Sequence, residues 1–298
     1  GVFEEFTGDS SEIVVAQALK FIERQVKNDR LSFTVIWFGT PHSPFRAADD
    51  DMRGVEHLDE ASRHQYGELV ALDSSIGTLR RDLRELKIAD NTLVWYCSDN
   101  GGLPKITPET VGGLRGFKGS LYEGGLRVPA IIEWPMGITA PRVTNYPAVT
   151  MDVFPTIGEI VGIPAEAHLE PADGLSLVQL FASESTKRPK PIPFNCLGRS
   201  AWLDNDLKLI CLSENRKKGN EYELYDLGAD PHEQDNLYQT RPAEAARMRK
   251  ALDSWLESVA ASIAGRDYPE GKLLPGDPEP RFWMELEAYQ PYIEEWKE

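Results

Sequence analysis

Residues 31–39 read LSFTVIWFG and residues 92–98 read TLVWYCS, and these two short runs decide the fold. Neither run carries a charged residue, and both are rich in β-branched and aromatic side chains, which is typical of strands buried on both faces. A third run of this kind, VPAIIEW, covers residues 128–134. We therefore predict three buried strands in the first half of the chain.

Two amphipathic helices are predicted on either side of the first strand. In the earlier helix Asp9 and Glu12 suit a capping box, and apolar residues recur at helical spacing: Val15, Leu19, Ile22 and Val26. In the later helix Asp59 suits the cap, and one stripe is apolar: Tyr66, Leu69, Ile76, Leu79, Leu83 and Leu86. Helices that alternate with buried strands predict an α/β fold, with a mostly parallel sheet flanked by helices.

The pattern changes in the last third of the chain. Prolines alternate with other residues over 189–193, which indicates a linker or a sheet edge. Residues 201–212 read AWLDNDLKLICL, a hairpin pattern with a polar turn. A further strand over 221–227 and an amphipathic helix over 242–260 complete a small α+β subdomain.

We accordingly divide the chain into two domains, residues 1–185 and residues 186–298. The tail from Asp267 has no clear period. Its aromatic residues suit either stacking on sugar rings or packing against the body of the protein: Trp283, Tyr289, Tyr292 and Trp296.

The chain is acidic. Its 48 acidic and 32 basic residues give a net charge of -16, which argues against nucleic acid or an anionic membrane surface as a partner. An anionic substrate would need local cations or a metal ion. No apolar run is long enough for a membrane span, and no signal peptide opens the chain.

The three cysteines form no pattern that is typical of a zinc site. They are Cys97, Cys196 and Cys211. A Cys196–Cys211 disulfide remains open, and Cys97 fits an ordinary buried position in its strand.

Polar residues follow the first two predicted strands, where the ligands of open α/β sheets bind. Asp99 and Asn100 offer the oxygens that calcium or magnesium prefers, although an Asx turn closed by Gly101 and Gly102 is the alternative. His42, between two prolines, suits proton donation to a leaving oxygen, the alternative being an ordinary surface histidine.

Residues 114–129, LRGFKGSLYEGGLRVP, combine glycines with cations. The glycines allow close backbone approach, so Lys118 is a candidate for binding an anionic group in an otherwise acidic protein. The spacing does not match a P-loop. We expect Arg127 and Glu123 to form an ordinary ion pair.

PHSPF, SDNGG and LRGFKGSLYEGGLRVPAIIEWP, in this order and at these separations, resemble the second half of a type I sulfatase. The resemblance continues to about residue 260. It implies an alkaline-phosphatase-like α/β domain, followed by a small subdomain with an antiparallel sheet. It also implies that Asp99 and Asn100 bind calcium, with magnesium as the alternative. Lys118 would contact the sulfate, and His42 would act as leaving-group acid or sulfate-binding donor.

The chain departs from this family in its nucleophile. The resemblance implies a formylglycine, made from the Cys or Ser of a Cys/Ser-x-Pro-x-Arg motif, and the sequence contains no such motif. We therefore expect an N-terminal half of the same protein to supply the nucleophile and further metal ligands. The resemblance also implies a periplasmic or secreted protein.

Three functions remain open. The leading one is hydrolysis of a sulfate monoester of a small molecule or glycan, with a sulfated carbohydrate favoured as substrate. The second is hydrolysis of a phosphonate or phosphodiester on the same fold. The third is an inactive fragment that binds sulfated glycans.

Overall fold

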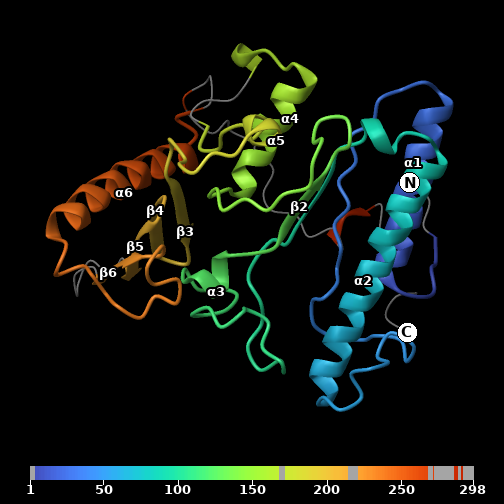
Figure 1. Cartoon of the computed structure of the whole chain (residues 1–298), viewed down its shortest axis with the longest axis horizontal. Coiled ribbons are helices and arrows are strands. Elements are labelled where there is room, and N and C mark those ends of the chain that lie inside the picture. Colours follow the sequence, from blue (N-terminus) through green and yellow to red (C-terminus); the bar gives the residue numbers. More distant parts are fainter. Residues whose placement is uncertain are drawn as a thin grey trace.

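The computed structural model describes residues 4–167, 172–213, 221–267, 271, 285–287 and 290, so the four aromatic residues of the tail named above lie outside the described residues. The helices are α1 (Ser10–Lys27), α2 (Glu60–Glu85), α3 (Glu123–Leu126), α4 (Val153–Val161), α5 (Gln179–Ala182) and α6 (Pro242–Ile263). The strands are β1 (Val94–Cys97), β2 (Ala130–Glu133), β3 (Ile192–Cys196), β4 (Arg199–Asp204), β5 (Leu207–Ser213) and β6 (Glu221–Asp226). Three short 3-10 segments cover Ala89–Asn91, Thr150–Asp152 and Ala165–Ala167. Figure 1 shows the α1–α2 pair at one side, β1 and β2 in the middle, and the β3–β6 sheet with α6 at the other side.

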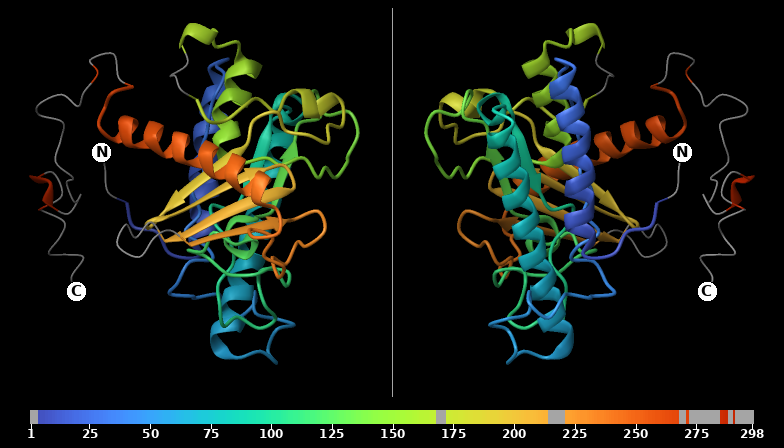
Figure 2. Two further views of the ribbon diagram at one scale, coloured as in Figure 1. Left: turned by 90° about the vertical axis from the view of Figure 1, so that its left-hand side faces the viewer. Right: turned by 90° about the vertical axis from the view of Figure 1, so that its right-hand side faces the viewer.

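Both helices predicted in the first hundred residues are confirmed, with their caps. The Asp9 carboxylate accepts hydrogen bonds from the backbone of Ser11, at 2.7 Å, and of Glu12. At the start of α2, Asp59 accepts from the backbone N–H and the hydroxyl of Ser62. The two helices lie side by side (Figure 2), and buried apolar residues join them: Val15, Ile22, Leu79 and Leu83.

Residues 31–39 are extended but not hydrogen-bonded as a strand, so the first predicted strand is wrong for this chain. Ile36 and Phe38 pack on the α1–α2 core. The alternate side chains point to solvent, with exposed fractions of 95% for Leu31 and 86% for Trp37. The period of two is that of a strand, but no described segment pairs with it or covers its outer face.

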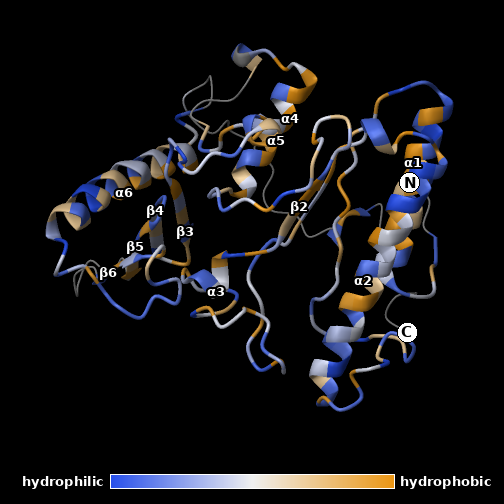
Figure 3. Ribbon diagram, viewed as in Figure 1, coloured by the Kyte–Doolittle hydropathy of each residue, from blue (hydrophilic) through white to orange (hydrophobic). Residues whose placement is uncertain are grey.

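The second and third predicted strands are confirmed as β1 and β2, but they pair antiparallel rather than parallel. Val94 lies opposite Glu133, and Cys97 opposite Ala130. Both strands are largely apolar (Figure 3), yet Cys97 is exposed and Ile131 is 65% exposed. Cys97 was expected to be buried, and that expectation is wrong because no described layer covers this end of the ribbon.

The small subdomain contains a four-stranded antiparallel sheet in the order β3-β4-β5-β6. The predicted hairpin is β4–β5, where Asn205 takes a left-handed conformation with φ of 55° in the turn. The proline-rich stretch contains the edge strand β3, which pairs with β4 on one side only. Pro193 is tolerated there because proline has no N–H to donate to a second neighbouring strand. Cys196 on β3 and Cys211 on β5 are separated by β4 and form no disulfide.

Both faces of this sheet are covered. On one face Leu209 and Leu224 pack against Met248 and Leu252 of α6, which crosses the sheet in Figure 2. On the other face Ile210 and Tyr225 pack against Leu121, which lies in the segment just before α3. The α/β part followed by a smaller antiparallel unit confirms the predicted fold class. The boundary at residues 185 and 186 stays a prediction.

The structure has no helix, among the residues it describes, that is long and apolar enough to cross a membrane.

Candidate functional site

The candidate metal ligands lie in the turn that follows β1. The carboxylate of Asp99 is exposed and Asn100 is half-buried. The turn is held by a hydrogen bond of 3.0 Å from the Ser98 hydroxyl to the Asn100 carbonyl. Since no described residue forms a hydrogen bond or ion pair with the Asp99 side chain, its oxygens are available to a ligand.

This turn lies directly against the glycine-rich segment that carries Lys118. The Gly101 N–H donates to the Gly125 carbonyl at 3.0 Å, and the Lys118 N–H donates to the Gly102 carbonyl at 2.9 Å. Two candidate elements that the sequence separates are thus joined through their backbones. The structure brings Asp99 and Asn100 into the same loop cluster as Lys118.

This contact requires a glycine at position 101, because there is no room for a side chain there. A Cβ added there would overlap the Gly124 carbonyl oxygen and lie 2.7 Å from the Gly125 Cα. Both clashes involve backbone, which cannot rotate away. Only glycine lets the two loops approach to this distance.

We expect Gly101→Ala to destabilise the protein by about 1–3 kcal/mol, because overpacking against backbone forces the two loops apart. Thermal unfolding of the variant measures this loss. Gly77→Ala is the matched control: nothing lies within 4 Å of a Cβ added there, on helix α2, so alanine should raise stability by roughly 0.5–1 kcal/mol. A Gly101→Ala protein as stable as the unmodified protein would contradict the close approach.

Lys118 has an exposed side chain. None of the residues that the structure describes forms an ion pair or hydrogen bond with its ammonium group. The neighbouring Gly116 and Gly119 both have positive φ, of 79° and 86°, which turns the chain sharply on either side of it. An unpaired cation on a tight loop of an acidic protein suits the binding of an anion.

His42 lies in an exposed loop, where its backbone N–H donates to the Gly39 carbonyl at 3.0 Å. The ring Nδ1 is 2.8 Å from the Ser43 carbonyl oxygen. A carbonyl only accepts, so Nδ1 carries the proton of that hydrogen bond, and Nε2 is the atom left for proton exchange. Within the described ranges no hydrogen bond or ion pair joins His42 to Asp99 or Lys118, so its place in the site stays a prediction.

The residues present make only part of a metal site. Calcium takes six to eight oxygen ligands, whereas the turn offers the side chains of Asp99 and Asn100. In the part of the chain that the structure describes, no group of three or more His, Cys, Asp and Glu is arranged to hold a metal ion. The donor chemistry of the turn fits a hard cation, but the remaining ligands have to come from elsewhere.

A buried ionic cluster next to this site was missed by the sequence analysis. The ammonium of Lys208 lies 2.8 Å from Glu123 and 2.9 Å from Glu233, and the side chains of Lys208 and Glu233 are fully buried. The expected Arg127–Glu123 ion pair is therefore wrong, since Glu123 pairs with Lys208 and Arg127 is exposed. The signal was available in the sequence: Lys208 interrupts an apolar run in a strand covered on both faces.

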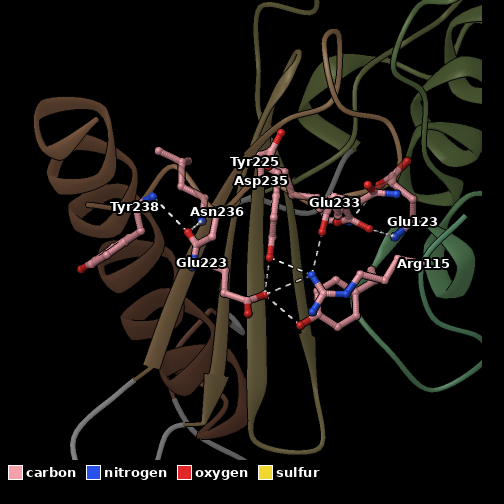
Figure 4. Close-up of polar contacts among 12 residues, drawn as sticks. Arg115, Glu123, Glu223, Tyr225, Glu233, Asp235, Asn236 and Tyr238 are labelled. Carbon is pink, nitrogen blue, oxygen red and sulfur yellow. Dashed lines mark hydrogen bonds and ion pairs between the residues drawn. The ribbon is translucent and has the colours of Figure 1, made fainter. Parts of the chain in front are cut away.

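A second set of polar contacts lies beside this cluster (Figure 4). Arg115 donates to the Tyr225 hydroxyl at 2.8 Å and to the Glu233 carbonyl at 2.7 Å, and its guanidinium lies 3.9 Å from the centre of the Tyr122 ring. Both tyrosine hydroxyls donate to Glu223 at 2.8 Å.

Burial and the Glu223 carboxylate raise the pKa of Tyr225 to about 12 and raise that of Tyr122 as well. Burial also raises the pKa of Glu233, which Lys208 opposes. Because the pKa values of Tyr122 and Tyr225 are raised, both tyrosine hydroxyls are neutral at neutral pH and can donate hydrogen bonds.

Comparison with known proteins places the chain among sulfatases. The family model described as Sulfatase matches residues 2–163. The chain is 33% identical over 201 residues to N-acetylgalactosamine-6-sulfatase of Sus scrofa. This match covers 63% of this chain and 37% of that protein. The chain is 30% identical over 189 residues to choline-sulfatase of Rhizobium meliloti (strain 1021), which covers 61% of this chain and 34% of that protein. The chain thus spans only about a third of these relatives.

Solved structures share the fold at lower identity. The structure of Ps i-CgsB in complex with k-i-k-neocarrahexaose superimposes with a TM-score of 0.75 at 24% identity, covering 86% of this chain and 56% of that one. The structure of BT4656 in complex with D-glucosamine-2-N,6-O-disulfate gives a TM-score of 0.53 at 24% identity, covering 70% of this chain and 42% of that one. At 24% identity these two structural similarities show that the chain shares their fold.

Proposed function

This chain belongs to the sulfatase family, and we propose that it supplies the sulfate-binding half, and part of the metal site, of an enzyme that hydrolyses sulfate monoesters. One observation carries the proposal: the backbone hydrogen bond from Lys118 to Gly102. It brings a cation that forms no ion pair or hydrogen bond with any described side chain beside the Asp99–Asn100 turn. This contact supports a single site to which one element contributes an anion-binding cation and the other contributes oxygen ligands for a hard cation. The name of one relative, N-acetylgalactosamine-6-sulfatase, favours a sulfated carbohydrate as substrate.

Each residue has a distinct role in the proposed reaction. The ammonium of Lys118 binds the sulfuryl oxygens and stabilises the charge that develops on them. Asp99 and Asn100 would hold a divalent cation, which would supply Lewis-acid stabilisation of negative charge. In its imidazolium form, with Nδ1–H bonded to the Ser43 carbonyl, His42 donates the proton on Nε2 to the alcohol oxygen as its bond to sulfur breaks and is left as the neutral imidazole. Overall, water is consumed and an alcohol, a sulfate ion and one proton are released.

The nucleophile has no counterpart in these 298 residues, because none of their cysteines or serines begins a Cys/Ser-x-Pro-x-Arg motif. We propose that the nucleophile and the missing metal ligands lie in another part of the same protein. The exposed apolar row of residues 31–37 supports this, since Leu31, Phe33, Val35 and Trp37 have exposed fractions from 58% to 95%. Apolar surface of this extent favours coverage by further chain. A secreted or periplasmic location is part of the same proposal.

The test is a substrate comparison on the complete protein that contains this chain. We expect it to hydrolyse 4-nitrophenyl sulfate with a higher kcat/KM than bis(4-nitrophenyl) phosphate or 4-nitrophenyl phenylphosphonate. The 298-residue chain by itself should hydrolyse none of them. Preference for a phosphorus ester would assign the complete protein to the second function named above. Binding of sulfated glycans with no turnover would assign it to the third.

A further inference from the structure

The segment that carries Lys118 is held at both ends by the small C-terminal sheet. At its start Arg115 bonds to the Tyr225 hydroxyl on β6 and to the Glu233 carbonyl that follows this strand. At its end the Glu123 side chain pairs with Lys208 on β5, and the Glu123 N–H donates to Glu233 at 2.7 Å. Figure 4 shows Arg115 and Glu123 meeting residues of the sheet from the side of α3.

Between these two anchors the sheet holds the segment by further contacts. Leu121 is buried against Ile210 and Tyr225, the Tyr122 hydroxyl donates to Glu223, and Arg199 donates to the Gly119 carbonyl at 2.9 Å. Lys118 and Gly119 are exposed, and the side chain of Lys118 contacts none of the described residues by a hydrogen bond or ion pair. Its backbone N–H has the single bond to Gly102. The position of the Lys118 ammonium therefore depends on how the sheet holds the loop, through the two anchors and the contacts between them.

The anchor at Glu123 is strongly restrained by its charges. Lys208 is a buried ammonium between two carboxylates, and Glu233 uses its other oxygen for the Glu123 N–H. Buried charges have to stay paired, because an unpaired one loses its solvation with no compensation. Glu123 is thus confined to the position that Lys208 and Glu233 allow.

We propose that Lys208 and Glu233, which lie in the C-terminal subdomain, are positioning residues for sulfate binding and act through Lys118. This inference rests on the proposed function, because it assigns Lys118 the sulfate. A displacement of about 1 Å in a binding group is sufficient to lower a rate by around 10²-fold. The subdomain therefore does more than complete the fold: it sets the geometry of the anion site.

The experiment measures the binding of inorganic sulfate to the complete protein by calorimetry, together with its turnover of 4-nitrophenyl sulfate. Lys208→Met removes the ammonium at similar length, and Glu123→Gln is the milder variant should Lys208→Met fail to fold. We expect both to weaken sulfate binding, by about tenfold or more for Lys208→Met. Met248→Ala is the matched control. It removes a buried side chain of α6 that packs on the opposite face of the same sheet, so it should lower the melting temperature while sulfate binding stays within about twofold.

A double-mutant cycle with Lys118→Ala separates positioning from a general loss of structure. If Lys208 acts through Lys118, Lys208→Met should weaken sulfate binding no further once Lys118 is alanine. An undiminished effect of Lys208→Met in that background would overturn the inference, as would an equal loss of sulfate binding in Met248→Ala. If Lys118→Ala itself leaves sulfate binding unchanged, the proposed role of Lys118 fails, which is a different result.

Discussion

Lys118→Ala is expected to lower sulfate release by the complete enzyme about 10²–10³-fold, the effect of removing one charge-stabilising donor from an active site. The variant should fold normally, because the side chain is exposed and the Lys118 N–H keeps its bond to Gly102 in alanine. Steady-state kinetics on 4-nitrophenyl sulfate give the loss, and thermal unfolding gives the stability. We expect the melting temperature to change little, as for most surface substitutions.

The control for Lys118→Ala is Lys105→Ala. Lys105 is an exposed cation in the loop that follows the Asp99–Asn100 turn, and nothing assigns it to the site. Its replacement changes the net charge equally and should leave kcat/KM nearly unchanged. Equal losses in both variants would show that general charge, rather than the position of Lys118, attracts the substrate.

Arg188→Met is expected to cause the largest loss of stability, about 3–5 kcal/mol. Arg188 and Asp152 form a bidentate ion pair of 2.7 and 2.8 Å with side chains 1% and 0% exposed. The Asp152 carboxylate also accepts from the Val149 and Leu175 N–H groups. Methionine would leave that carboxylate buried with no opposite charge, and the melting temperature should fall by on the order of 10 °C.

Two further variants make this measurement specific. Arg53→Met removes an ion pair with Asp50 whose side chains are 75% and 81% exposed, so it should leave stability unchanged within about 0.5 kcal/mol. Asp152→Asn in the Arg188→Met background removes the stranded charge and should recover part of the loss. A melting temperature of Arg188→Met equal to that of the unmodified protein would show that the pair does not stabilise the fold.

Helices and hairpins were predictable because their signals are local. The caps Asp9 and Asp59 and the apolar spacing that follows each of them predicted α1 and α2. The polar turn with Asn205 predicted β4–β5. Each of these features depends on residues close in the sequence, so propensity and spacing are sufficient.

Strand pairing was less predictable, because it depends on partners far away in the chain. The composition of residues 31–39 is that of a buried strand, but a strand forms only where a neighbour offers hydrogen bonds. β1 and β2 have the apolar composition that is shared by parallel and antiparallel central strands, so their antiparallel pairing was not visible. Cys97 is exposed for a related reason, since no described segment packs over its end of the β1–β2 ribbon.

The candidate site was predictable in part. Glycines with Asp99 and Asn100, and glycines with Lys118, marked the two loops, and the contact between Gly101 and Gly125 joins them. Lys208 was visible as a charge within an apolar run, but its partners Glu123 and Glu233 were not predicted. They come from two other segments of the chain, and residue spacing does not show which distant segments meet in the fold.

The most direct test is a crystal structure of the complete protein with calcium and inorganic sulfate bound. The account predicts a cation within about 2.3–2.6 Å of side-chain oxygens of both Asp99 and Asn100. It also predicts a sulfate ion within hydrogen-bonding distance of the Lys118 ammonium, with His42 on the same side. A cation and a sulfate bound elsewhere, with Asp99, Asn100 and Lys118 all facing solvent, would contradict it.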